Sequence, residues 1–207
     1  MEDKWLAWAK RLHAIASTGM HFGEGVYDRE RYDEVARIAR QMLAELGSTP
    51  IERINGLISD FAKGYSTPTI DVRGAVIEDG KILLVQEKSD GLWTLPGGYA
   101  EVGISASENI VKEIWEEAGL RVGVRGLYGV FHKAKHAYDP DARDFYKLFF
   151  LCNRIESNAP IAGSEIADVG FFAPDRLPPL SRGRVIEKHI EAALAFHADP
   201  ERPAIFD

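Results

Sequence analysis

The sequence predicts an α/β domain that follows a smaller helical domain, and two changes of pattern along the chain carry this prediction. Through the first 64 residues, apolar side chains recur every three to four positions, as they do along one face of a helix. From residue 71 onward, short apolar runs alternate with turn residues around one central helix. Because 207 residues suffice for one domain and an accessory piece, we assign residues 1–65 to a helical N-terminal extension and residues 66–207 to the α/β domain.

Helices are expected throughout the extension. The first carries an apolar stripe formed by Trp5, Trp8, Leu12 and Ile15. The pattern then breaks at Gly19, Gly23 and Gly25. Asp28 is the expected N-cap of a second helix, which ends before Gly47, and a third helix runs from near Pro50 to Phe61. The stripe predicts packing against a neighbour, but a neighbour in the same chain and one in a second copy produce the same pattern.

A loop-like linker at residues 65–69 separates the extension from the α/β domain. An Asp-Gly turn within residues 78–81 predicts a hairpin between two apolar strands. The central helix starts at about Ser105 and is stopped by Gly119. The expected strands are residues 71–77, 82–86, 120–132, 145–152 and 169–172, and the expected helices are 105–118 and 184–197.

Composition and charge argue against several classes of function. Acidic side chains outnumber basic ones by 32 to 25, which disfavours a protein that holds duplex nucleic acid or an anionic membrane by bulk charge. The extension is nearly neutral, whereas a DNA-binding helix-turn-helix carries a basic excess. The chain shows neither a run of about 20 apolar residues nor a signal peptide. We therefore expect a soluble cytoplasmic protein, with Cys152 as a buried, inert thiol.

The stretch that carries chemistry is the central helix and the turn before it. The helix places Glu113, Glu116 and Glu117 on one side, because they are spaced three and four positions apart. An ordinary solvated acidic face would have the same spacing. The Pro-Gly-Gly turn at residues 96–98 favours a site instead, since bare backbone there can bring carbonyl oxygens beside the carboxylates. Such a set of hard oxygen donors suits Mg²⁺ or Mn²⁺ and does not suit zinc.

This stretch resembles the signature of the Nudix hydrolases, G-x5-E-x7-R-E-U-x-E-E-x-G-U, in which U is a bulky aliphatic residue. Counted from Gly98, the matching positions are Glu113, Ile114, Glu116, Glu117, Gly119 and Leu120. Two positions depart from the signature, because Ile104 stands where the family has Glu and Lys112 stands where it has Arg. In the family these two side chains commonly form a salt bridge that braces the loop. Glu101, three residues before Ile104, is a candidate replacement for the missing acid.

The resemblance continues over nearly the whole chain. Residues 4–65 are similar to the helical extension of a bacterial subgroup that includes CDP-choline pyrophosphatases and relatives assigned as ADP-ribose pyrophosphatases. Further motifs that fit this subgroup lie at residues 71–73, 88–91, 171–172 and 177–181. The resemblance implies a Nudix-type α/β/α sandwich with a mixed sheet. It also implies a homodimer in which the extension supports the dimer and covers the active site.

The implied reaction is the attack of water on one phosphorus of a nucleoside diphosphate linked to a group X, yielding a nucleoside monophosphate and phospho-X. Mg²⁺, or Mn²⁺ in its place, is the implied cofactor. Glu113 and Glu117 are the first choices as its ligands, and Glu116 and the Gly97 carbonyl complete the set. Glu165, in a turn before a strand, is the candidate general base, and an exposed loop glutamate without a role explains it equally well.

The candidates for substrate contact are basic, aromatic or part of the turn. Arg73 interrupts an apolar strand, and His132 and Lys133 stand at the end of another. Charges at strand ends also serve simply to keep a sheet edge soluble. Gly98 is assigned to substrate binding as well. The aromatic residues that can stack on a base or enclose a choline-like cation are Trp93, Tyr99 and Tyr138, and core packing is the simpler interpretation for the first of them.

Two other functions remain open at the level of sequence. A nucleotide sensor without turnover would explain Ile104 and Lys112, but it has little reason to keep three adjacent acids. Action on nucleic-acid ends is disfavoured by the net charge of −7. The expected partners are therefore a small nucleoside diphosphate derivative and a second copy of the chain, with no membrane and no nucleic acid. CDP-choline, ADP-ribose and nucleotide sugars cannot be separated from the sequence.

Overall fold

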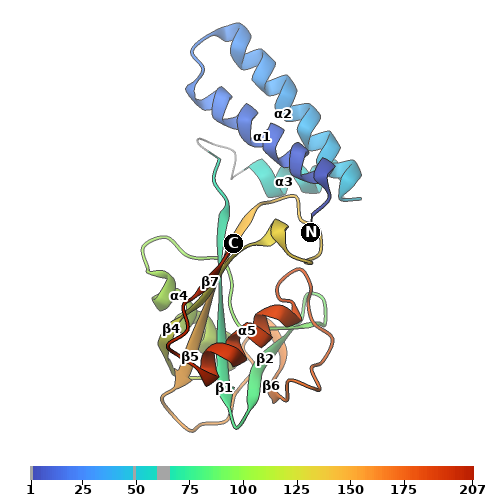
Figure 1. Cartoon of the computed structure of the whole chain (residues 1–207). Coiled ribbons are helices and arrows are strands. Elements are labelled where there is room, and N and C mark those ends of the chain that lie inside the picture. Colours follow the sequence, from blue (N-terminus) through green and yellow to red (C-terminus); the bar gives the residue numbers. More distant parts are fainter. Residues whose placement is uncertain (1, 49, 60–65) are drawn as a thin grey trace. The chain divides into compact units, whose positions relative to one another are not determined.

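The computed structural model describes residues 2–48, 50–59 and 66–207, without the side chains of residues 56–59. The chain divides into two compact units. The first, called the helical unit here, spans residues 1–69 and takes in a second segment, residues 134–145. The second, the sheet unit, spans residues 70–133 and 146–207. Figure 1 shows the elements of both units.

The helices of the helical unit are α1 (Lys4–Phe22), α2 (Val26–Leu46) and α3 (Ile51–Ser59) (Figure 1). Asp3 caps α1, because its carboxylate accepts the Trp5 N–H at 2.8 Å. The predicted break at Gly19 is wrong, since α1 continues past it and stops only at Gly23. One glycine costs a helix interior only about 1 kcal/mol, and here its missing side chain leaves room for the ring of Tyr32.

The second helix also starts earlier than the sequence predicts. Gly25 is its N-cap, and Asp28 lies within the first turn of α2. A carboxylate in that turn is favourable beside the positive end of the helix, so the acid marks the helix start without capping it. The predicted end before Gly47 is confirmed, and so is the start of the third helix beside Pro50. The predicted extension of that helix to Phe61 lies outside the described residues.

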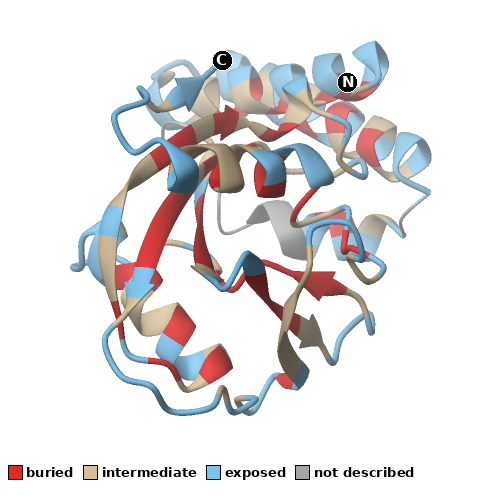
Figure 2. Cartoon of the chain, turned by 60° about the horizontal axis from the view of Figure 1, so that its bottom comes forward, coloured by how far each residue is buried: buried red, intermediate tan, exposed pale blue. Residues whose placement is uncertain are grey.

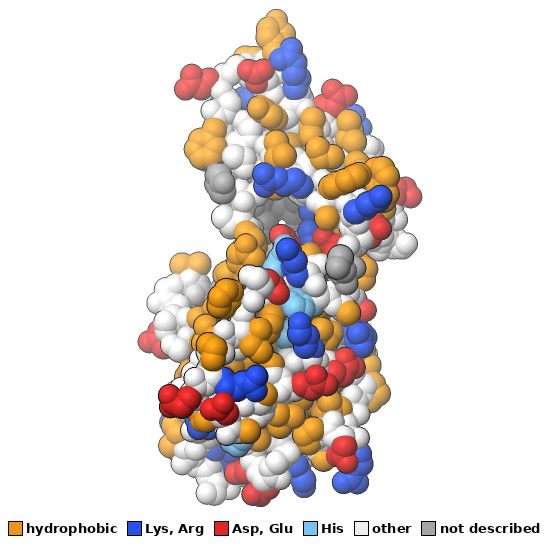
Figure 3. All heavy atoms as spheres, in the orientation of Figure 1, with side chains coloured by type: hydrophobic (Ala, Val, Ile, Leu, Met, Phe, Trp, Pro, Cys, Tyr) orange, Lys and Arg blue, Asp and Glu red, His pale blue; other side chains and the backbone are white. Residues whose placement is uncertain are grey.

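The apolar stripe of α1 stays on the surface of the described chain. Its four side chains, Trp5, Trp8, Leu12 and Ile15, are each 40–52% exposed. The two tryptophan rings contact each other edge to face, with 4.9 Å between their centroids. The buried side chains of α1 and α2 are mostly smaller and include Ala9, Ala16, Ala36 and Ala39. Hydrophobic side chains are visible on the surface of this unit in Figure 3.

The sheet unit is built on a mixed sheet with the strand order β3–β2–β1–β5–β4–β7, and β6 also pairs with β2. The strands are β1 (Thr69–Glu78), β2 (Lys81–Glu87), β3 (Trp93–Thr94), β4 (Val122–His132), β5 (Phe145–Arg154), β6 (Ile166–Phe172) and β7 (Ile205–Phe206). β1 and β2 form the predicted hairpin, whose turn residues Asp79 and Gly80 both have positive φ. β4 pairs antiparallel with β5 and parallel with β7, which makes the sheet mixed.

Two buried clusters lie on opposite faces of this sheet, because successive side chains of a strand point to opposite sides. Val72 and Val76 of β1 pack in one cluster with α4 (Ala106–Ala118). Ala75 packs in the other cluster with α5 (Glu187–Ala198). Figure 2 shows buried residues concentrated along the strands and on one side of each of these helices. The predicted α/β/α sandwich, which follows a helical region in the chain, is therefore confirmed.

The ends of α4 are defined by its own sequence. Ser105 Oγ accepts the Glu108 N–H at 3.2 Å, and the Glu108 carboxylate accepts the Ser105 N–H at 2.8 Å, which together form a capping box. Gly119 ends the helix in the left-handed region, with a φ of 64°. Because the caps set where the helix begins and ends, they also set which turns of α4 carry the predicted glutamates.

The two shortest strands of the sheet have only two residues each. β3 and β7 are not predicted from the sequence, because two residues are too few for a recognisable pattern. Each depends on pairing with a longer strand, β3 with β2 and β7 with β4.

Cys152 is buried as predicted, and burial raises the pKa of its thiol to about 12. Within residues 2–48, 50–59 and 66–207, no helix is both long and apolar enough to cross a membrane.

Candidate active site

The Pro-Gly-Gly turn runs beside β1 and reaches α4. The Val72 N–H donates to the Gly98 carbonyl oxygen at 2.8 Å. Gly97 has a φ of 141°, and a Cβ atom built there would lie only 2.0 Å from the Val72 carbonyl oxygen, so this position requires glycine. The Gly97 N–H donates to Glu117 Oε2 at 2.9 Å. The turn therefore connects the edge of β1 to the glutamate side of α4.

Glu113 and Glu117 face this turn from α4. A Cβ atom at Gly98 would lie 2.9 Å from Glu113 Oε1, so the carboxylate packs directly against bare backbone. Burial raises the pKa of Glu117 to about 8, although Arg73 and the Gly97 N–H act in the opposite direction. Burial also raises the pKa of Glu113, again opposed by Arg73. Both acids therefore gain from a nearby cation that would stabilise their ionised forms.

Glu116, the third predicted acid, is exposed and paired with a lysine. Its Oε2 accepts a hydrogen bond from Lys112 Nζ at 2.8 Å. The same ammonium group donates to Glu101 Oε1 at 2.9 Å, and the two contacts together raise the pKa of Lys112. The Glu101–Lys112 pair proposed from the sequence as a replacement brace is therefore present. It connects the loop after the turn to the middle of α4.

Arg73 belongs to a buried ionic cluster with Asp71 and Lys147. The guanidinium donates from Nε and Nη2 to the two Asp71 oxygens at 3.0 and 2.9 Å, and from Nη1 to the Leu95 carbonyl at 3.1 Å. Lys147 Nζ donates to Asp71 Oδ1 at 2.8 Å. Burial alone would raise the pKa of Asp71, but the two cations lower it to about 2. The cluster thus anchors the chain that enters the turn.

Lys147 is one of three polar residues that the sequence analysis missed. It lies inside an apolar run, and burial lowers its pKa to about 8 despite the attraction of Asp71. The charge of Glu87, at the end of β2, helps to raise the pKa of Glu117 and that of Arg73. The third residue, Asn109, is fully buried on α4. Of these three residues only Lys147 gave a signal in the sequence, because a lysine is unusual within an apolar run.

Arg184 explains two motifs that the sequence analysis attributed to the subgroup. Its guanidinium contacts Glu87 at 3.2 Å and Asp90 at 2.6 Å. Ser181 Oγ donates to the same Asp90 carboxylate at 2.8 Å. These contacts join the motif at residues 88–91 to the motif at residues 177–181. They also hold Glu87 at the end of β2.

Glu165 is exposed, and its turn is attached to the end of α4. The Gly163 N–H donates to the Glu117 carbonyl oxygen at 3.0 Å. Lys88 Nζ holds the turn from the other side by donating to the Ser164 carbonyl oxygen at 2.8 Å. The structure therefore brings the turn that carries Glu165 to the helix turn that carries Glu117. The role of Glu165 as a base stays a prediction.

The two basic candidates at the end of β4 lie in different surroundings. The backbone N–H of His132 donates to Asp207 at 2.6 Å, and its ring contacts that of Tyr146. Lys133 is buried, and its charge helps to lower the pKa of Lys147. Lys133 is therefore a buried cation whose charge acts on Lys147, whereas the backbone of His132 is bonded to Asp207. Their contact with substrate stays a prediction.

The three aromatic candidates also lie in different surroundings. Trp93 is buried, and its ring meets that of Phe172 edge to face at 4.6 Å between centroids. The core-packing interpretation of Trp93 is thus confirmed. Tyr99, beside the turn, is about half exposed. Tyr138 lies in the segment that belongs to the helical unit.

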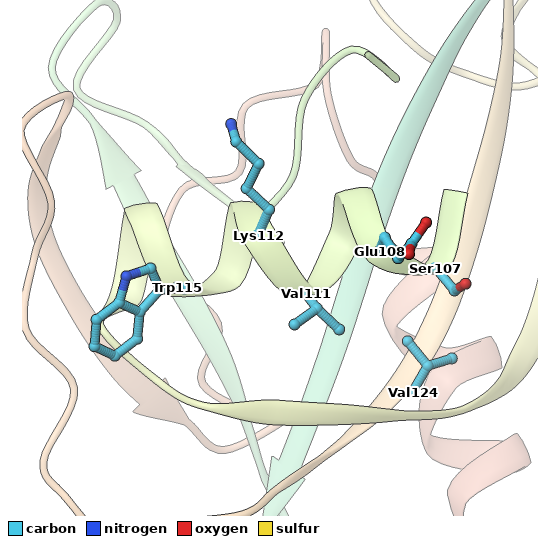
Figure 4. Close-up of a pocket in the computed structure, with 6 residues that line it drawn as sticks. All are labelled: Ser107, Glu108, Val111, Lys112, Trp115 and Val124. Carbon is cyan, nitrogen blue, oxygen red and sulfur yellow. The ribbon is translucent and has the colours of Figure 1, made fainter. Parts of the chain in front are cut away.

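A groove lies beside α4, and neither Glu113 nor Glu117 lines it. It has a volume of about 510 Å³ and is lined by Ser107, Glu108, Val111, Lys112, Trp115 and Val124. Figure 4 shows Val111 and Trp115 on the side of α4 that faces Val124 of β4, while Lys112 points away from them. Glu113 and Glu117 each follow these groove residues by two positions, which is about 200° around the helix. Val111 and Trp115 therefore lie on a different side of α4 from Glu113 and Glu117.

The donors on the side of α4 that faces the turn fit Mg²⁺. Glu113 and Glu117 offer hard carboxylate oxygens directly beside the backbone of the glycine turn. Among the residues that the structure describes, no three acidic, His or Cys side chains already converge as metal ligands. Glu116 is instead held by Lys112, so it would have to leave that ion pair to join the other two. The Gly97 carbonyl as a ligand stays a prediction.

Comparison with known proteins agrees with this geometry. Residues 68–194 match the family model of the NUDIX domain, and residues 3–58 match that of the UDP-X-like, N-terminal oligomerisation domain. YjhB of Bacillus subtilis (strain 168), named provisionally as an ADP-ribose pyrophosphatase, is 42% identical over 207 residues, covering 100% of this chain and 99% of that protein. A crystal structure of a UDP-X diphosphatase has a TM-score of 0.63 and 34% identity, covering 98% of each chain.

A second solved structure supports the same assignment. The ADP-ribose pyrophosphatase from Streptococcus suis 89-1591 has a TM-score of 0.62 and 38% identity, covering 68% of this chain and 100% of that one. The matched NUDIX domain includes the turn, α4 and the glutamates that face it. The chain therefore belongs to the Nudix hydrolases and is a pyrophosphohydrolase that carries an N-terminal domain of the UDP-X-like oligomerisation type.

Proposed function

We propose that this enzyme hydrolyses the diphosphate of a nucleoside diphosphate linked to a group X, in a Mg²⁺-dependent reaction that yields a nucleoside monophosphate and phospho-X. The observation that carries the proposal is the position of Glu113 and Glu117, two acids with raised pKa values held against the Gly97–Gly98 turn. Such acids favour a divalent cation, and a diphosphate requires one to offset its own charge.

The residues of the chain divide the work in this mechanism. Glu113, Glu117 and Glu116, with the Gly97 carbonyl, would hold Mg²⁺; when bound, the ion would supply a lower pKa for the attacking water and would offset charge on the phosphoryl oxygens. Arg73 remains charged because Asp71 raises its pKa, so it keeps a fixed positive charge beside the turn. Glu165 is the proposed acceptor of the proton of the water, which the backbone bond between its turn and the Glu117 carbonyl oxygen supports.

The substrate is proposed as a class. Relatives of this chain are named for ADP-ribose and for UDP-X, and the sequence resemblance adds CDP-choline. We expect turnover of at least one of ADP-ribose, a UDP-sugar and CDP-choline in the presence of Mg²⁺. Both products are phosphate monoesters, so phosphatase treatment releases inorganic phosphate from them and not from the diphosphate substrate. Phosphate released per minute then reports hydrolysis.

The control for this assay is the same reaction with EDTA, in which we expect no phosphate release. If no compound is turned over with Mg²⁺ or Mn²⁺ at high enzyme concentration, the proposal is wrong and the nucleotide-sensor alternative is favoured. The main argument for that sensor is that Ile104 and Lys112 replace the Glu and Arg whose salt bridge braces the loop in the family. The Glu101–Lys112 ion pair weakens this argument, because a brace exists without the missing acid.

We also propose that the enzyme is a homodimer assembled through the apolar stripe of α1. Its side chains are 40–52% exposed although they include two tryptophans, and aromatic residues of this kind are enriched at protein interfaces. The family match over residues 3–58 to an oligomerisation domain supports the same assignment. A second copy of the chain is the proposed partner, because in a two-fold dimer the same surface patch of each copy packs against the other.

Replacing Trp5 and Trp8 with Ser should convert a dimer to a monomer. A buried interface tryptophan typically contributes 2 kcal/mol or more, so each substitution should weaken dimerisation by at least about 30-fold. Sedimentation velocity across a concentration series measures the change. Ile155→Ser is the matched control, because Ile155 is an exposed apolar residue of the sheet unit. A wild-type protein that sediments as a monomer at all concentrations would contradict the proposal.

A further inference from the structure

Asn109 of α4 is buried completely, although asparagine is a poor helix former and its amide requires hydrogen-bond partners. Its Oδ1 accepts the Glu101 N–H at 2.7 Å. Its Nδ2 lies 3.5 Å from Glu113 Oε1, one helical turn further on. One neutral side chain therefore contacts both the loop after the glycine turn and a carboxylate of the candidate metal site.

The orientation of this amide is determined by its surroundings. A backbone N–H can only be accepted by the oxygen of an asparagine side chain, so the Glu101 contact assigns Oδ1. The NH₂ group must then point the other way, toward the Glu113 carboxylate. The same oxygen, Glu113 Oε1, is also the carboxylate atom nearest Gly98, 2.9 Å from where a Cβ atom at that glycine would lie. Asn109 and the backbone of Gly98 thus both lie close to one oxygen of the Glu113 carboxylate.

The loop after the turn is attached to α4 by two contacts of unequal strength. The Glu101–Lys112 ion pair is exposed on both sides, and pairs of that kind contribute about 0–1 kcal/mol. The hydrogen bond from the Glu101 N–H to Asn109 is part-buried and its acceptor belongs to a fully buried side chain, so losing it leaves a polar group unsatisfied at a cost of about 1–3 kcal/mol. Asn109 is therefore the stronger of the two attachments.

We propose that Asn109 is a positioning residue for the metal site: it attaches the loop through Glu101 and orients the Glu113 carboxylate. It takes over the bracing that the family signature assigns to the pair at positions 104 and 112. The inference rests on the proposed metal-dependent function. Outer-shell partners of metal ligands typically change metal affinity by about 10–100-fold when they are removed.

The test compares Asn109→Ala with Lys112→Met in Mn²⁺ binding, measured by electron paramagnetic resonance without substrate. Alanine is the best helix former, so α4 should fold in the first variant. We expect Asn109→Ala to raise the Mn²⁺ dissociation constant about 10–100-fold. Lys112→Met removes the exposed brace and a positive charge, so it should not weaken cation binding. Turnover in Asn109→Ala should fall at low Mg²⁺ and recover at saturating Mg²⁺, with little change in KM.

The outcomes separate this proposal from the one on which it rests. If wild-type protein binds no Mn²⁺, the metal-dependent function fails. If wild-type and folded Asn109→Ala protein bind Mn²⁺ equally, or if Asn109→Ala and Lys112→Met weaken binding equally, the role of Asn109 is wrong. Hydrogen exchange of the wild-type Glu101 amide gives a readout that needs no variant. We expect protection there, and exchange at the rate of a free loop would overturn the proposal.

Discussion

Replacing Glu117 with Gln should reduce turnover by more than about 100-fold, the upper range for the loss of an outer-shell partner of a metal. In the wild-type chain the Gly97 N–H donates to Glu117 Oε2 at 2.9 Å. The amide of the variant keeps the size of the side chain, and its oxygen can still accept this hydrogen bond. It cannot supply the negative charge that a Mg²⁺ ligand needs. Steady-state rates at saturating substrate and Mg²⁺ measure the loss, and circular dichroism checks that the fold is retained.

The same variant should change how stability depends on pH in the absence of metal. The pKa of Glu117 is about 8 in the folded protein against 4.5 for an ordinary glutamate, so the folded state binds its proton more tightly than the unfolded state does. Stability from this group is therefore full below pH 4.5 and is lost as the pH rises toward 8. Glu117→Gln removes this contribution, so its unfolding free energy should vary less across that range.

Glu191→Gln is the control for both measurements, because Glu191 is an exposed residue of α5 outside the catalytic set. It should leave the rate and the pH dependence unchanged. A Glu117→Gln enzyme that keeps more than a tenth of the wild-type rate would remove Glu117 from the proposed ligand set. A variant whose stability follows the wild-type pH dependence would show that burial does not raise the pKa of Glu117.

The second large effect is expected at the buried ionic cluster. Asp71→Asn leaves Arg73 and Lys147 buried without their carboxylate, and removing one partner of a buried ion pair typically costs about 3–5 kcal/mol. Urea unfolding at neutral pH measures this change in the free energy of unfolding. The penalty should be larger at pH 6 than at pH 9, because Lys147, with a pKa of about 8 even beside Asp71, sheds its proton more easily when the carboxylate is gone.

The double variant Asp71→Asn with Lys147→Met isolates the cause. Removing the second cation relieves the uncompensated charge, so we expect it to recover part of the lost stability, as a double-mutant cycle would show. Glu156→Gln is the surface control, because its pair with Arg121 is exposed and should contribute less than about 1 kcal/mol. An Asp71→Asn penalty no larger than that of the control would show that the cluster does not stabilise the fold.

Local patterns account for most of the fold that could be predicted. The α4 boundaries follow from the capping box at Ser105 and from Gly119, and both signals lie within a few residues of the ends they define. The β1–β2 hairpin follows from its Asp-Gly turn in the same way. The errors at Gly19 and Asp28 arise where a contact between helices, or a charge within the first turn, outweighs the local signal.

For the candidate site, too, the sequence predicts the local features and the tertiary contacts decide the rest. The spacing of Glu113, Glu116 and Glu117 predicts one acidic side of a helix, because helical periodicity depends only on positions in the sequence. Which of these acids are buried depends on what the turn places beside them. Glu116 lies in the open next to Lys112, whereas Glu117 accepts the Gly97 N–H from a residue 20 positions away. No spacing rule reports such a contact.

The sequence by itself determined the α/β class, the helical extension, the Nudix signature and the candidate metal-binding acids, since each depends on residues close together in the chain. Only the tertiary structure decided that the α1 stripe is exposed, that Lys147 and Arg73 share Asp71, and that Asn109 joins the loop to Glu113. Burial and pKa are set by whatever the fold brings near a side chain. They therefore depend on residues that are distant in the sequence, and the residue's own neighbours do not reveal them.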